Sequence, residues 1–573
     1  MSVEPSATTG VATAALGDLP ASFNVASFLV EAAEECPEQL AITRQPRRVR
    51  GSWESVTYSE LESLASRVAR GLQRRGVRKG DRVCLFVKPG IELIAITYAL
   101  FKLGAIPVLA DPGMGRDRLL AVVRRMRPRI FIGIPVAQAA RLAFRKAFAS
   151  VELVITVGPR YAWGGTTYRA LLREEDTPLA PLETSREDTA AILFTSGSTG
   201  PPKGVTYTHG MFHAQTRALR ALYDFQPGEV DLACFPLFAL FDVAFRMTSA
   251  IPEMDASRPG RCDPALVVRA AAEAEATTTF GSPAIWRRVA PWCSARGESL
   301  ALRRVLIAGA PVPPSLVAEL RQLLPEGGDV FTPYGATESL PVSSISGREI
   351  LDLREAVESG RGTCVGRLAP GIELKVVALD EEPIPSLEDA EEVTTPMALG
   401  ELCVRGPVVT REYADDPEAT LLAKIAGTAG ATDVWHRMGD VGYRDHEGLL
   451  WFTGRKAHRL ETERGLVMPV PLENIFNVHE GVHRTAVVGH GPRGQEVPVV
   501  VVEPAPGHFP HGEAALDRFL AELRAIATRH FETRGLDTFL FHPAFPVDPR
   551  HNAKIHREEL REWAQAELEK SLP

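Results

Sequence analysis

The sequence has 573 residues, 45% of them hydrophobic and 24% charged, and carries a net charge of −8 with a pI near 6.0. A chain of this length exceeds what one hydrophobic core organises, so two or three domains are expected. The acidic balance offers no electrostatic basis for binding nucleic acid or an anionic membrane, so a small anionic ligand has to be held by local geometry.

Signals for cross-linking, secretion and membrane insertion are not recognisable in the sequence. Its seven cysteines are scattered and odd in number, which favours neither a disulfide framework nor a zinc ribbon. Residues 1–20 lack the basic start and apolar core of a signal peptide. The most apolar stretch, residues 91–110, is interrupted by Glu92 and Lys102 and broken by Gly104. We therefore expect a cytoplasmic protein with no transmembrane segment.

Strands and helices alternate in the first part of the chain. Residues 82–87 form a predicted buried strand, residues 90–104 a helix with apolar side chains at helical spacing, and residues 105–110 a second strand. A series of this kind is typical of parallel sheets covered by helices. The same alternation predicts further strands at 131–135, 152–158, 190–195, 278–284, 303–311 and 329–338.

The pattern changes twice beyond Gly360. Segments such as 372–380 and 400–407 alternate in polarity between turns, which favours antiparallel strands or a small barrel. Helical and strand segments with their own apolar residues reappear after Lys456. The fold class we predict is α/β: a flexible tail (1–20), a large N-terminal domain of helix-covered parallel sheets with an antiparallel or barrel part (21–454), a hinge (455–458), and a small, mobile α+β C-terminal lid domain (459–573).

The stretch LFTSGSTGPPKG, residues 193–204, has the composition of a phosphate-binding loop. Its glycines allow sharp turns with exposed backbone N–H groups, and its hydroxyl and ammonium groups add donors. It is not a Walker A loop, because Lys203 is followed by Gly204 where that motif needs Ser or Thr, and no kinase motifs follow. A surface hairpin of small residues is the alternative. The candidate phosphate ligands are Thr195, Ser196, Gly197, Ser198, Thr199, Gly200 and Lys203.

Four further motifs follow this loop: YGATES (334–339), WHRMGD (435–440), GRK (454–456) and NAKI (552–555). Together the five resemble the adenylate-forming superfamily of acyl-CoA synthetases, luciferases and nonribosomal-peptide adenylation domains. The resemblance extends over nearly the whole chain. It implies the fold of that superfamily, ATP and Mg²⁺ as cofactors, and an acyl-adenylate intermediate.

The resemblance implies nucleotide-binding roles for several residues. Tyr334 would stack on adenine, and Asp440 would accept hydrogen bonds from the ribose hydroxyls, which suits a carboxylate with two oxygens. Arg455 would support the ribose and phosphate near the hinge. The remaining predicted nucleotide contacts are Gly309, Ala310, Pro311 and Gly335.

Catalytic roles follow from the same resemblance. Glu338 would hold Mg²⁺, with Thr195 as a second ligand, because a hard cation prefers oxygen donors. Thr337 would contact phosphate or carboxylate. Lys554 would reach in from the C-terminal domain and neutralise the charge that develops at the α-phosphate during acyl attack.

One branch of the superfamily, the β-lactone synthetases of bacterial long-chain olefin biosynthesis, is similar beyond these motifs. In that branch a 2-alkyl-3-hydroxy fatty acid is adenylated, and its β-hydroxyl closes on the carbonyl to give a β-lactone, AMP and pyrophosphate. Asp242 could orient that hydroxyl or help to remove its proton, although a buried structural role explains it equally well. The similar segments are 107–113, 131–135, 235–242, 251–255, 280–284, 332–342, 362–366, 436–443 and 545–555.

The apolar segment CFPLFALFDVAF, residues 234–245, has two interpretations of equal weight. It could form a wall for long alkyl chains, or it could be ordinary helix core, because apolar periodicity does not separate the two. The β-lactone interpretation implies a β-hydroxy fatty acid substrate and is compatible with a complex with an upstream condensing enzyme and a downstream β-lactone-processing enzyme.

Two other functions remain open from the sequence. A long-chain acyl-CoA or acyl-carrier-protein ligase would act through the same acyl-AMP, but the segment after the hinge, 454–473, departs from the pattern of thiol-using relatives, and Ala457 replaces their usual Asp or Lys. A non-catalytic nucleotide-binding relative is the third, and the presence of Glu338, Asp440 and Lys554 argues against it.

Two histidine patterns are predicted to be structural. HEGVH at residues 479–483 matches the zinc-protease signature. However, Gly481 and the strand-like sequence after it predict that a helix starting at Leu472 ends at Gly481. His209 and His213 have helical spacing without a third ligand, which favours a polar helix face.

Overall fold

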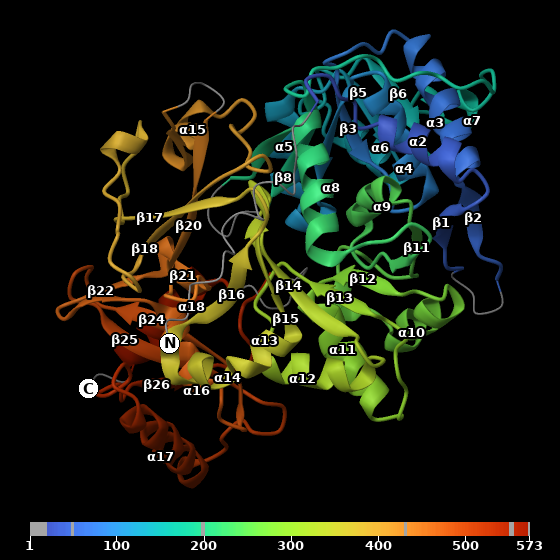
Figure 1. Cartoon of the computed structure of the whole chain (residues 1–573). Coiled ribbons are helices and arrows are strands. Elements are labelled where there is room, and N and C mark those ends of the chain that lie inside the picture. Colours follow the sequence, from blue (N-terminus) through green and yellow to red (C-terminus); the bar gives the residue numbers. More distant parts are fainter. Residues whose placement is uncertain (1–19, 47–50, 196–200, 429–432, 549–554, 571–573) are drawn as a thin grey trace, which may run out of the picture.

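The computed structural model describes residues 20–46, 51–195, 201–428, 433–548 and 555–570. Within these ranges the strands form two large sheets and two small ones, and helices pack on both faces of the large sheets (Figure 1). None of the helices within these ranges combines the length and the apolar character needed to cross a bilayer.

The first large sheet is parallel apart from one edge hairpin. Its helices are α3 (Tyr58–Gln73), α4 (Ile91–Lys102), α5 (Arg116–Met126), α6 (Pro135–Ala143) and α7 (Tyr168–Leu171). Side chains on β3 alternate, since Val83 and Leu85 pack on α3 and α4 whereas Cys84 packs on α5. The predicted strand and helix alternation is confirmed here. The strand order is β7 (Thr166–Thr167), β6 (Leu153–Thr156), β5 (Ile130–Gly133), β3 (Arg82–Phe86), β4 (Ile106–Ala110), β8 (Thr189–Thr195) and β9 (Lys203–Thr208).

The second large sheet has a parallel half and an antiparallel half. In the parallel half, Val305 and Ile307 of β13 face α10 to α12, and Leu306 faces α8 and α9. The helices are α2 (Ser27–Glu35), α8 (His209–Tyr223), α9 (Ala239–Phe245), α10 (Pro264–Glu273), α11 (Pro283–Ser294) and α12 (Pro314–Leu323). The parallel strands are β1 (Leu40–Arg44), β11 (Thr248–Ile251), β10 (Val230–Leu232), β12 (Thr278–Gly281), β13 (Arg304–Ile307) and β14 (Asp329–Ala336), with β2 (Glu54–Thr57) antiparallel at the edge.

The antiparallel half continues from β14 without a break. The predicted antiparallel strands are confirmed, and they extend the large sheet through pairing of β15 with β16 instead of forming a separate barrel. These strands are β15 (Ser339–Ser346), β16 (Thr363–Leu368), β21 (Leu450–Arg455), β20 (Val434–Arg444), β18 (Gly400–Arg405) and β17 (Glu373–Val377), with β19 (Lys424–Ala426) beside β20. Short helices α13 (Gly347–Asp352), α14 (Arg354–Ala356) and α15 (Pro417–Ala423) connect them.

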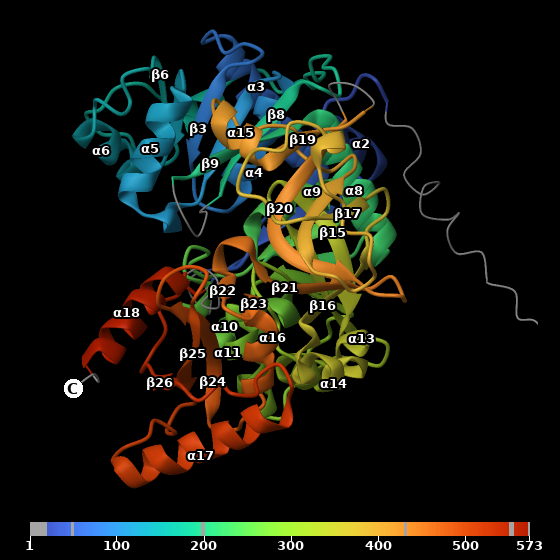
Figure 2. The same cartoon turned by 90° about the vertical axis from the view of Figure 1, so that its left-hand side faces the viewer.

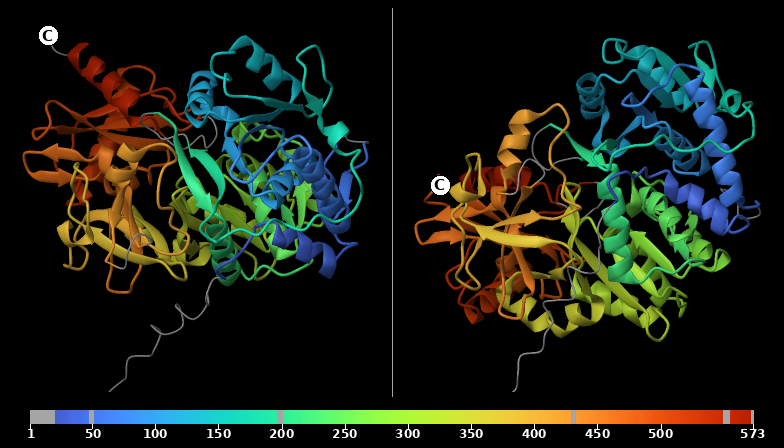
Figure 3. Two further views of the ribbon diagram at one scale, coloured as in Figure 1. Left: turned by 90° about the horizontal axis from the view of Figure 1, so that it is seen from above. Right: turned by 45° about the horizontal axis from the view of Figure 1, so that its top comes forward.

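The C-terminal segment has its own small core, coloured red in Figure 2. Val500 and Val502 of β25 pack on α16 and α17, while Val499 and Val501 pack on α18, so the strand carries apolar side chains on both faces. Figure 3 shows this segment beside the yellow and orange antiparallel strands. The placement of the domain boundaries at 455–458 stays a prediction. The elements are β22 (Leu460–Thr462), β23 (Gly465–Val467), α16 (Pro469–Phe476), β24 (Val482–His490), β25 (Val497–Pro504), α17 (Glu513–Arg529), β26 (Phe539–Phe541) and α18 (Arg557–Lys570).

The histidine patterns are placed by local hydrogen bonds. Helix α16 ends at Phe476, earlier than predicted. His479 Nδ1 accepts a hydrogen bond from the backbone N–H of Gly481, and His483 lies on β24. The two histidines therefore do not share a helix. The predicted polar helix face at His209 and His213 is wrong. His209 is 1% exposed and accepts the backbone N–H of Val25, and His213 packs between Phe23 and Phe28.

Two carboxyl groups are buried side by side beneath α9. Asp231, in the middle of β10, and Asp242, on α9, are both fully buried, and Ser249 Oγ donates a hydrogen bond to Asp242. Burial and the neighbouring Asp242 raise the pKa of Asp231 well above its ordinary value. Burial raises the pKa of Asp242 to about 7. Burial therefore favours the neutral form of Asp231 beside Asp242.

This pair predicts a pH dependence of stability. Both folded-state pKa values lie above those of the unfolded chain, so the folded protein binds more protons and stability falls as the pH rises from about 4 towards 7. Asp231→Asn removes one titrating group and keeps nearly the same side-chain volume. We expect the melting temperature of this variant to fall less between pH 5 and pH 8 than that of the wild type. Each pKa unit of difference between the folded and unfolded states corresponds to about 1.4 kcal/mol of stability.

The exposed Asp517→Asn variant on α17 serves as the matched control and should keep the wild-type pH profile. An Asp231→Asn profile that coincides with that of the wild type would contradict the prediction.

Candidate active site

The carboxyl ends of the parallel strands in the two large sheets open into one cavity. Residues that follow β3, β4 and β5 line it from one side, and residues that follow β10, β12 and β13 line it from the other. In open α/β sheets ligands bind at this end of the strands. The cavity volume is about 1980 Å³, well above the 300–1,000 Å³ of common small-molecule sites. It can therefore hold more than a nucleotide.

Three predicted nucleotide residues meet beside the cavity, and Arg455 is the one of them that lines it in the described part of the chain. The Tyr334 hydroxyl donates to Asp440 Oδ2 at 2.5 Å, and Arg455 Nη1 lies 3.0 Å from Asp440 Oδ1. Asp440 and Arg455 are register partners on β20 and β21, so strand pairing fixes their approach. Burial and Asp440 raise the pKa of Tyr334 well above its ordinary value, which keeps the hydroxyl a donor. Both oxygens of the Asp440 carboxylate therefore have a partner within this cluster.

Glu338 and Thr337 lie in the turn between β14 and β15 and line the cavity. The Tyr413 hydroxyl donates to Glu338 Oε1 at 2.7 Å. The backbone N–H and the hydroxyl of Thr410 donate to the Glu338 carbonyl at 2.9 and 3.1 Å. The hydroxyl of Tyr207, on β9, donates to the Thr337 carbonyl. Glu338 is thereby held from two neighbouring segments.

The segment 409–414, which we call the strap, joins this turn to strand β9. Val409 bridges to Ser339, Tyr413 bridges to Val205, and Ala414 donates its N–H to the Gly204 carbonyl at 2.7 Å. The strap thus fixes Glu338 relative to the strand that begins at Lys203. The strap was not predictable from the sequence, because its residues show no periodicity and belong to none of the motifs.

The ring of Tyr413 lies between two ammonium groups. Lys203 Nζ is 5.1 Å and Lys424 Nζ 5.9 Å from its centroid. Lys203 begins β9 opposite Thr195 and lines the cavity. Lys424 is buried, it donates to Thr410, and burial lowers its pKa to about 7. Tyr413 therefore connects the predicted phosphate-loop lysine to the predicted metal-binding carboxylate.

Several predicted residues have no described side chain. Ser196, Gly197, Ser198, Thr199, Gly200 and Lys554 lie outside the described residues. Thr195 is placed only as the last residue of β8.

The predicted glycines are near the cavity. Gly309 lines it with φ +94°, a conformation that favours glycine, and Gly335 lines it where an added Cβ would come within 2.4 Å of the Ser339 carbonyl oxygen. Ala310 and Pro311 follow Gly309 and are not among the cavity-lining residues in the described part of the chain.

The phenylalanine-rich segment supplies both wall and core. Phe235, Phe238 and Phe241 line the cavity, whereas Phe245 is buried among α8 and β13 side chains. The interpretation as a cavity wall therefore holds for some residues of the segment, and the interpretation as helix core holds for others. Asp242 is not among the lining residues within the described ranges, because its carboxyl faces Asp231 and Ser249.

A buried charge cluster lies beside the predicted hinge. Glu401, 1% exposed, accepts hydrogen bonds from Arg437 at 2.7 Å and from Lys456 at 3.0 Å. Arg437 also donates to the Glu382 carbonyl at 2.7 Å, and Lys456 to the Asp380 carbonyl at 2.7 Å. The loop 380–382 and the start of the 3₁₀ turn Lys456–His458 are thus fixed together.

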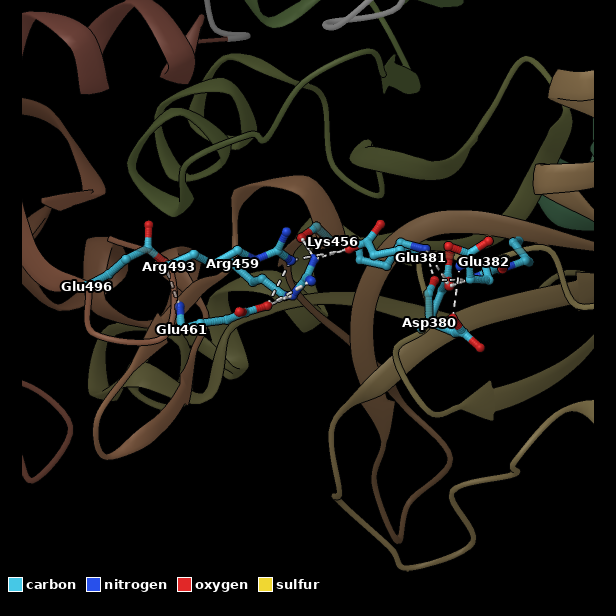
Figure 4. Close-up of polar contacts among 10 residues, drawn as sticks. Asp380, Glu381, Glu382, Lys456, Arg459, Glu461, Arg493 and Glu496 are labelled. Atoms are coloured by element: carbon cyan, nitrogen blue, oxygen red, sulfur yellow. Dashed lines mark hydrogen bonds and ion pairs between the residues drawn. The ribbon is translucent and has the colours of Figure 1, made fainter. Parts of the chain in front are cut away.

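A second, more exposed group of ion pairs joins the same loop to the C-terminal segment (Figure 4). Glu381 pairs with Arg459 at 2.6 Å and with Arg493 at 3.5 Å. Glu461 pairs with the same two arginines at 2.9 and 2.8 Å. We call these four residues the clip.

Comparison with known proteins places the chain in a family. Residues 29–414 match the family of AMP-binding enzymes. The chain is 45% identical to "Olefin beta-lactone synthetase" of Stenotrophomonas maltophilia, over 96% of this chain and 99% of that protein. It is 44% identical to the protein of the same name from Xanthomonas campestris pv. campestris, over 94% of this chain and 97% of that one.

Among solved structures, the amide bond synthetase McbA from Marinactinospora thermotolerans is similar, with a TM-score of 0.76, 23% identity, and coverage of 94% of this chain and 99% of that chain. This likeness confirms the predicted fold class. The chain thus belongs to the AMP-binding enzyme family.

Proposed function

We propose that this chain is an ATP-dependent β-lactone synthetase. It adenylates a 2-alkyl-3-hydroxy fatty acid and closes the acyl-adenylate to a β-lactone, releasing AMP and pyrophosphate. The observation that carries the proposal is the continuity of one cavity from Arg455, Glu338 and Lys203 to the phenylalanine-rich wall. The 44–45% identity to two proteins named olefin beta-lactone synthetase supports it.

In the first step the substrate carboxylate attacks the α-phosphorus of ATP, and the bond to pyrophosphate breaks. Asp440 and Arg455 hold the ribose, and Lys203 faces the phosphates. Lys554 neutralises charge at the α-phosphate, which is transition-state stabilisation. The segment 459–573 acts as the lid that carries this lysine into the site.

Mg²⁺ fits the residues near the phosphates. Glu338 presents a carboxylate to the cavity and keeps it oriented through Tyr413, and Mg²⁺ commonly binds one or two carboxylates together with substrate phosphates. When bound, the ion would neutralise charge on the leaving pyrophosphate. Thr195 is the proposed second ligand.

In the second step the β-hydroxyl oxygen attacks the acyl carbonyl carbon of the same molecule, the bond from that carbon to the phosphate oxygen breaks, AMP leaves, and the hydroxyl proton passes to the leaving phosphate or to solvent. Holding the hydroxyl beside the carbonyl gives the advantage of an intramolecular reaction. The apolar wall formed by Phe235, Phe238 and Phe241 excludes the water that would hydrolyse the adenylate. A cytoplasmic location and a complex with condensing and lactone-processing enzymes are part of this proposal.

The proposal predicts thiol-independent turnover. With ATP, Mg²⁺ and a 2-alkyl-3-hydroxy acid, and with no thiol present, we expect AMP and β-lactone in equal amounts, measured by chromatography and mass spectrometry. A product that forms only when CoA is added would indicate an acyl-CoA ligase instead. If no AMP forms with any acid, the chain is a nucleotide-binding protein without this activity.

Lys554→Ala should abolish adenylate formation and leave ATP binding intact, because the lysine acts on charge that develops in the transition state. Pyrophosphate release and the dissociation constant for ATP measure the two effects. Lys570→Ala, at the end of α18, is the control and should behave as the wild type. Activity retained in Lys554→Ala would remove this lysine from the mechanism.

Tyr413→Phe should raise the Mg²⁺ concentration needed for half-maximal adenylation by about tenfold, the effect of losing one charge-assisted hydrogen bond of about 1.4 kcal/mol. The ring between Lys203 and Lys424 is retained, so the KM for the acid should change little. A Mg²⁺ titration at saturating ATP measures this. An unchanged requirement would show that the hydroxyl does not position Glu338.

A further inference from the structure

We propose that the cavity holds the two alkyl chains of its substrate in two separate apolar arms. The inference rests on the proposed function and extends it to the placement of each chain. We define the phenylalanine arm by Leu219, Phe238, Phe241 and Phe280, and the α5–α6 arm by Leu119, Leu120, Val123, Ala137, Ala140 and Phe144.

The phenylalanine arm lies at the carboxyl ends of β10 and β12. Phe238 stacks on Phe280 with ring centroids 4.7 Å apart and planes 8° from parallel, and Phe241 lies 5.8 Å from Phe238. Leu219 of α8 belongs to the same hydrophobic cluster. These rings fix each other, so the arm has rigid apolar walls that keep their shape around a flexible chain.

The α5–α6 arm lies at the carboxyl ends of β3 and β5, in the other sheet. Its buried side chains, Leu120 and Val123, belong to a hydrophobic cluster with Phe131 that shares no member with the cluster of the phenylalanine arm. On α6, Ala137 and Ala140 are three residues apart, so both small side chains face the cavity on one side of the helix. The small side chains leave room beside α5.

The α5–α6 arm lies beside an exposed part of α6, since Val136, at the start of that helix, lines the cavity and is 69% exposed. The phenylalanine arm is backed by the buried Leu306 and Met247, which belong to the same hydrophobic cluster as its rings.

The chemistry of the substrate requires two exits from the reacting centre. Its two chains leave from neighbouring carbons, one bearing the carboxyl group and the other the hydroxyl that attacks it. Ring closure needs that hydroxyl beside the carbonyl, and this requirement fixes the torsion angle about the bond between the two carbons. The two chains then leave in different directions. A straight-chain acid would need only one arm. The cavity volume of about 1980 Å³ and its two apolar ends suit the branched acid.

The test fills the α5–α6 arm from α6. Ala140 is exposed to the cavity, so Ala140→Phe adds a ring to open space without displacing core side chains. Ala139→Phe is the matched control, because Ala139 is exposed on the same helix and does not line the cavity. Three acids are compared: one with two long chains, one with only the 2-alkyl chain shortened to methyl, and one with only the other chain shortened.

We expect Ala140→Phe to lower kcat/KM for the acid with two long chains at least tenfold, measured as pyrophosphate release. One of the two shortened acids, and not the other, should restore wild-type kcat/KM, and the KM for ATP should stay unchanged. Phe241→Trp narrows the phenylalanine arm. Its kcat/KM should therefore be restored by the other shortened acid, the one that does not restore Ala140→Phe. Ala139→Phe should match the wild type with every acid.

The same loss with all three acids, or no loss with any of them, would overturn the two-arm assignment. Ala140→Leu provides a smaller obstruction if Ala140→Phe does not reach the wild-type melting temperature, and the same comparison applies to it. Failure of the proposed function is distinguishable, because it would show in the wild type, which would then release no lactone from the acid with two long chains.

Discussion

The position of the site depends on one topological constraint, the meeting of two sets of parallel strand ends. A parallel strand leaves its sheet at the carboxyl end and must connect to a crossover helix, so loops gather there and leave a crevice. In this chain two such crevices, one from β3 to β5 and one from β10 to β13, face each other across one cavity. The large volume is a consequence of that opposition.

The polar end of the cavity is built on the antiparallel continuation of the second sheet. Register between β20 and β21 sets Asp440 against Arg455, and the strap sets Glu338 against the strand that starts at Lys203. Both devices use backbone pairing to place charged side chains. The polar end of the cavity therefore has a rigid frame, while side chains on α6, α9 and their neighbours form its apolar walls.

Much of the fold could be predicted because it rests on local periodicity. The strands β3, β4 and β8 and the helix α4 follow from apolar spacing alone, and the cluster of Tyr334, Asp440 and Arg455 follows from motif order. Tyr413, Thr410 and Lys424 could not be found in this way, because their contacts with Glu338 join segments some seventy or more residues apart. The burial of His209 could not be predicted for the same reason, because its hydrogen-bond partner is the distant backbone N–H of Val25.

The two groups of charges beside the predicted hinge respond differently to ionic strength. Glu401 and Arg437 are 1% and 2% exposed, so dissolved salt hardly screens their attraction, and the loop 380–382 stays fixed. In the clip, Glu381 is 57% exposed and Arg493 is 60% exposed, and attraction between such groups weakens as salt is added. The salt content of the medium therefore adjusts how firmly the clip holds the C-terminal segment, while the inner cluster keeps Lys456 against the loop 380–382.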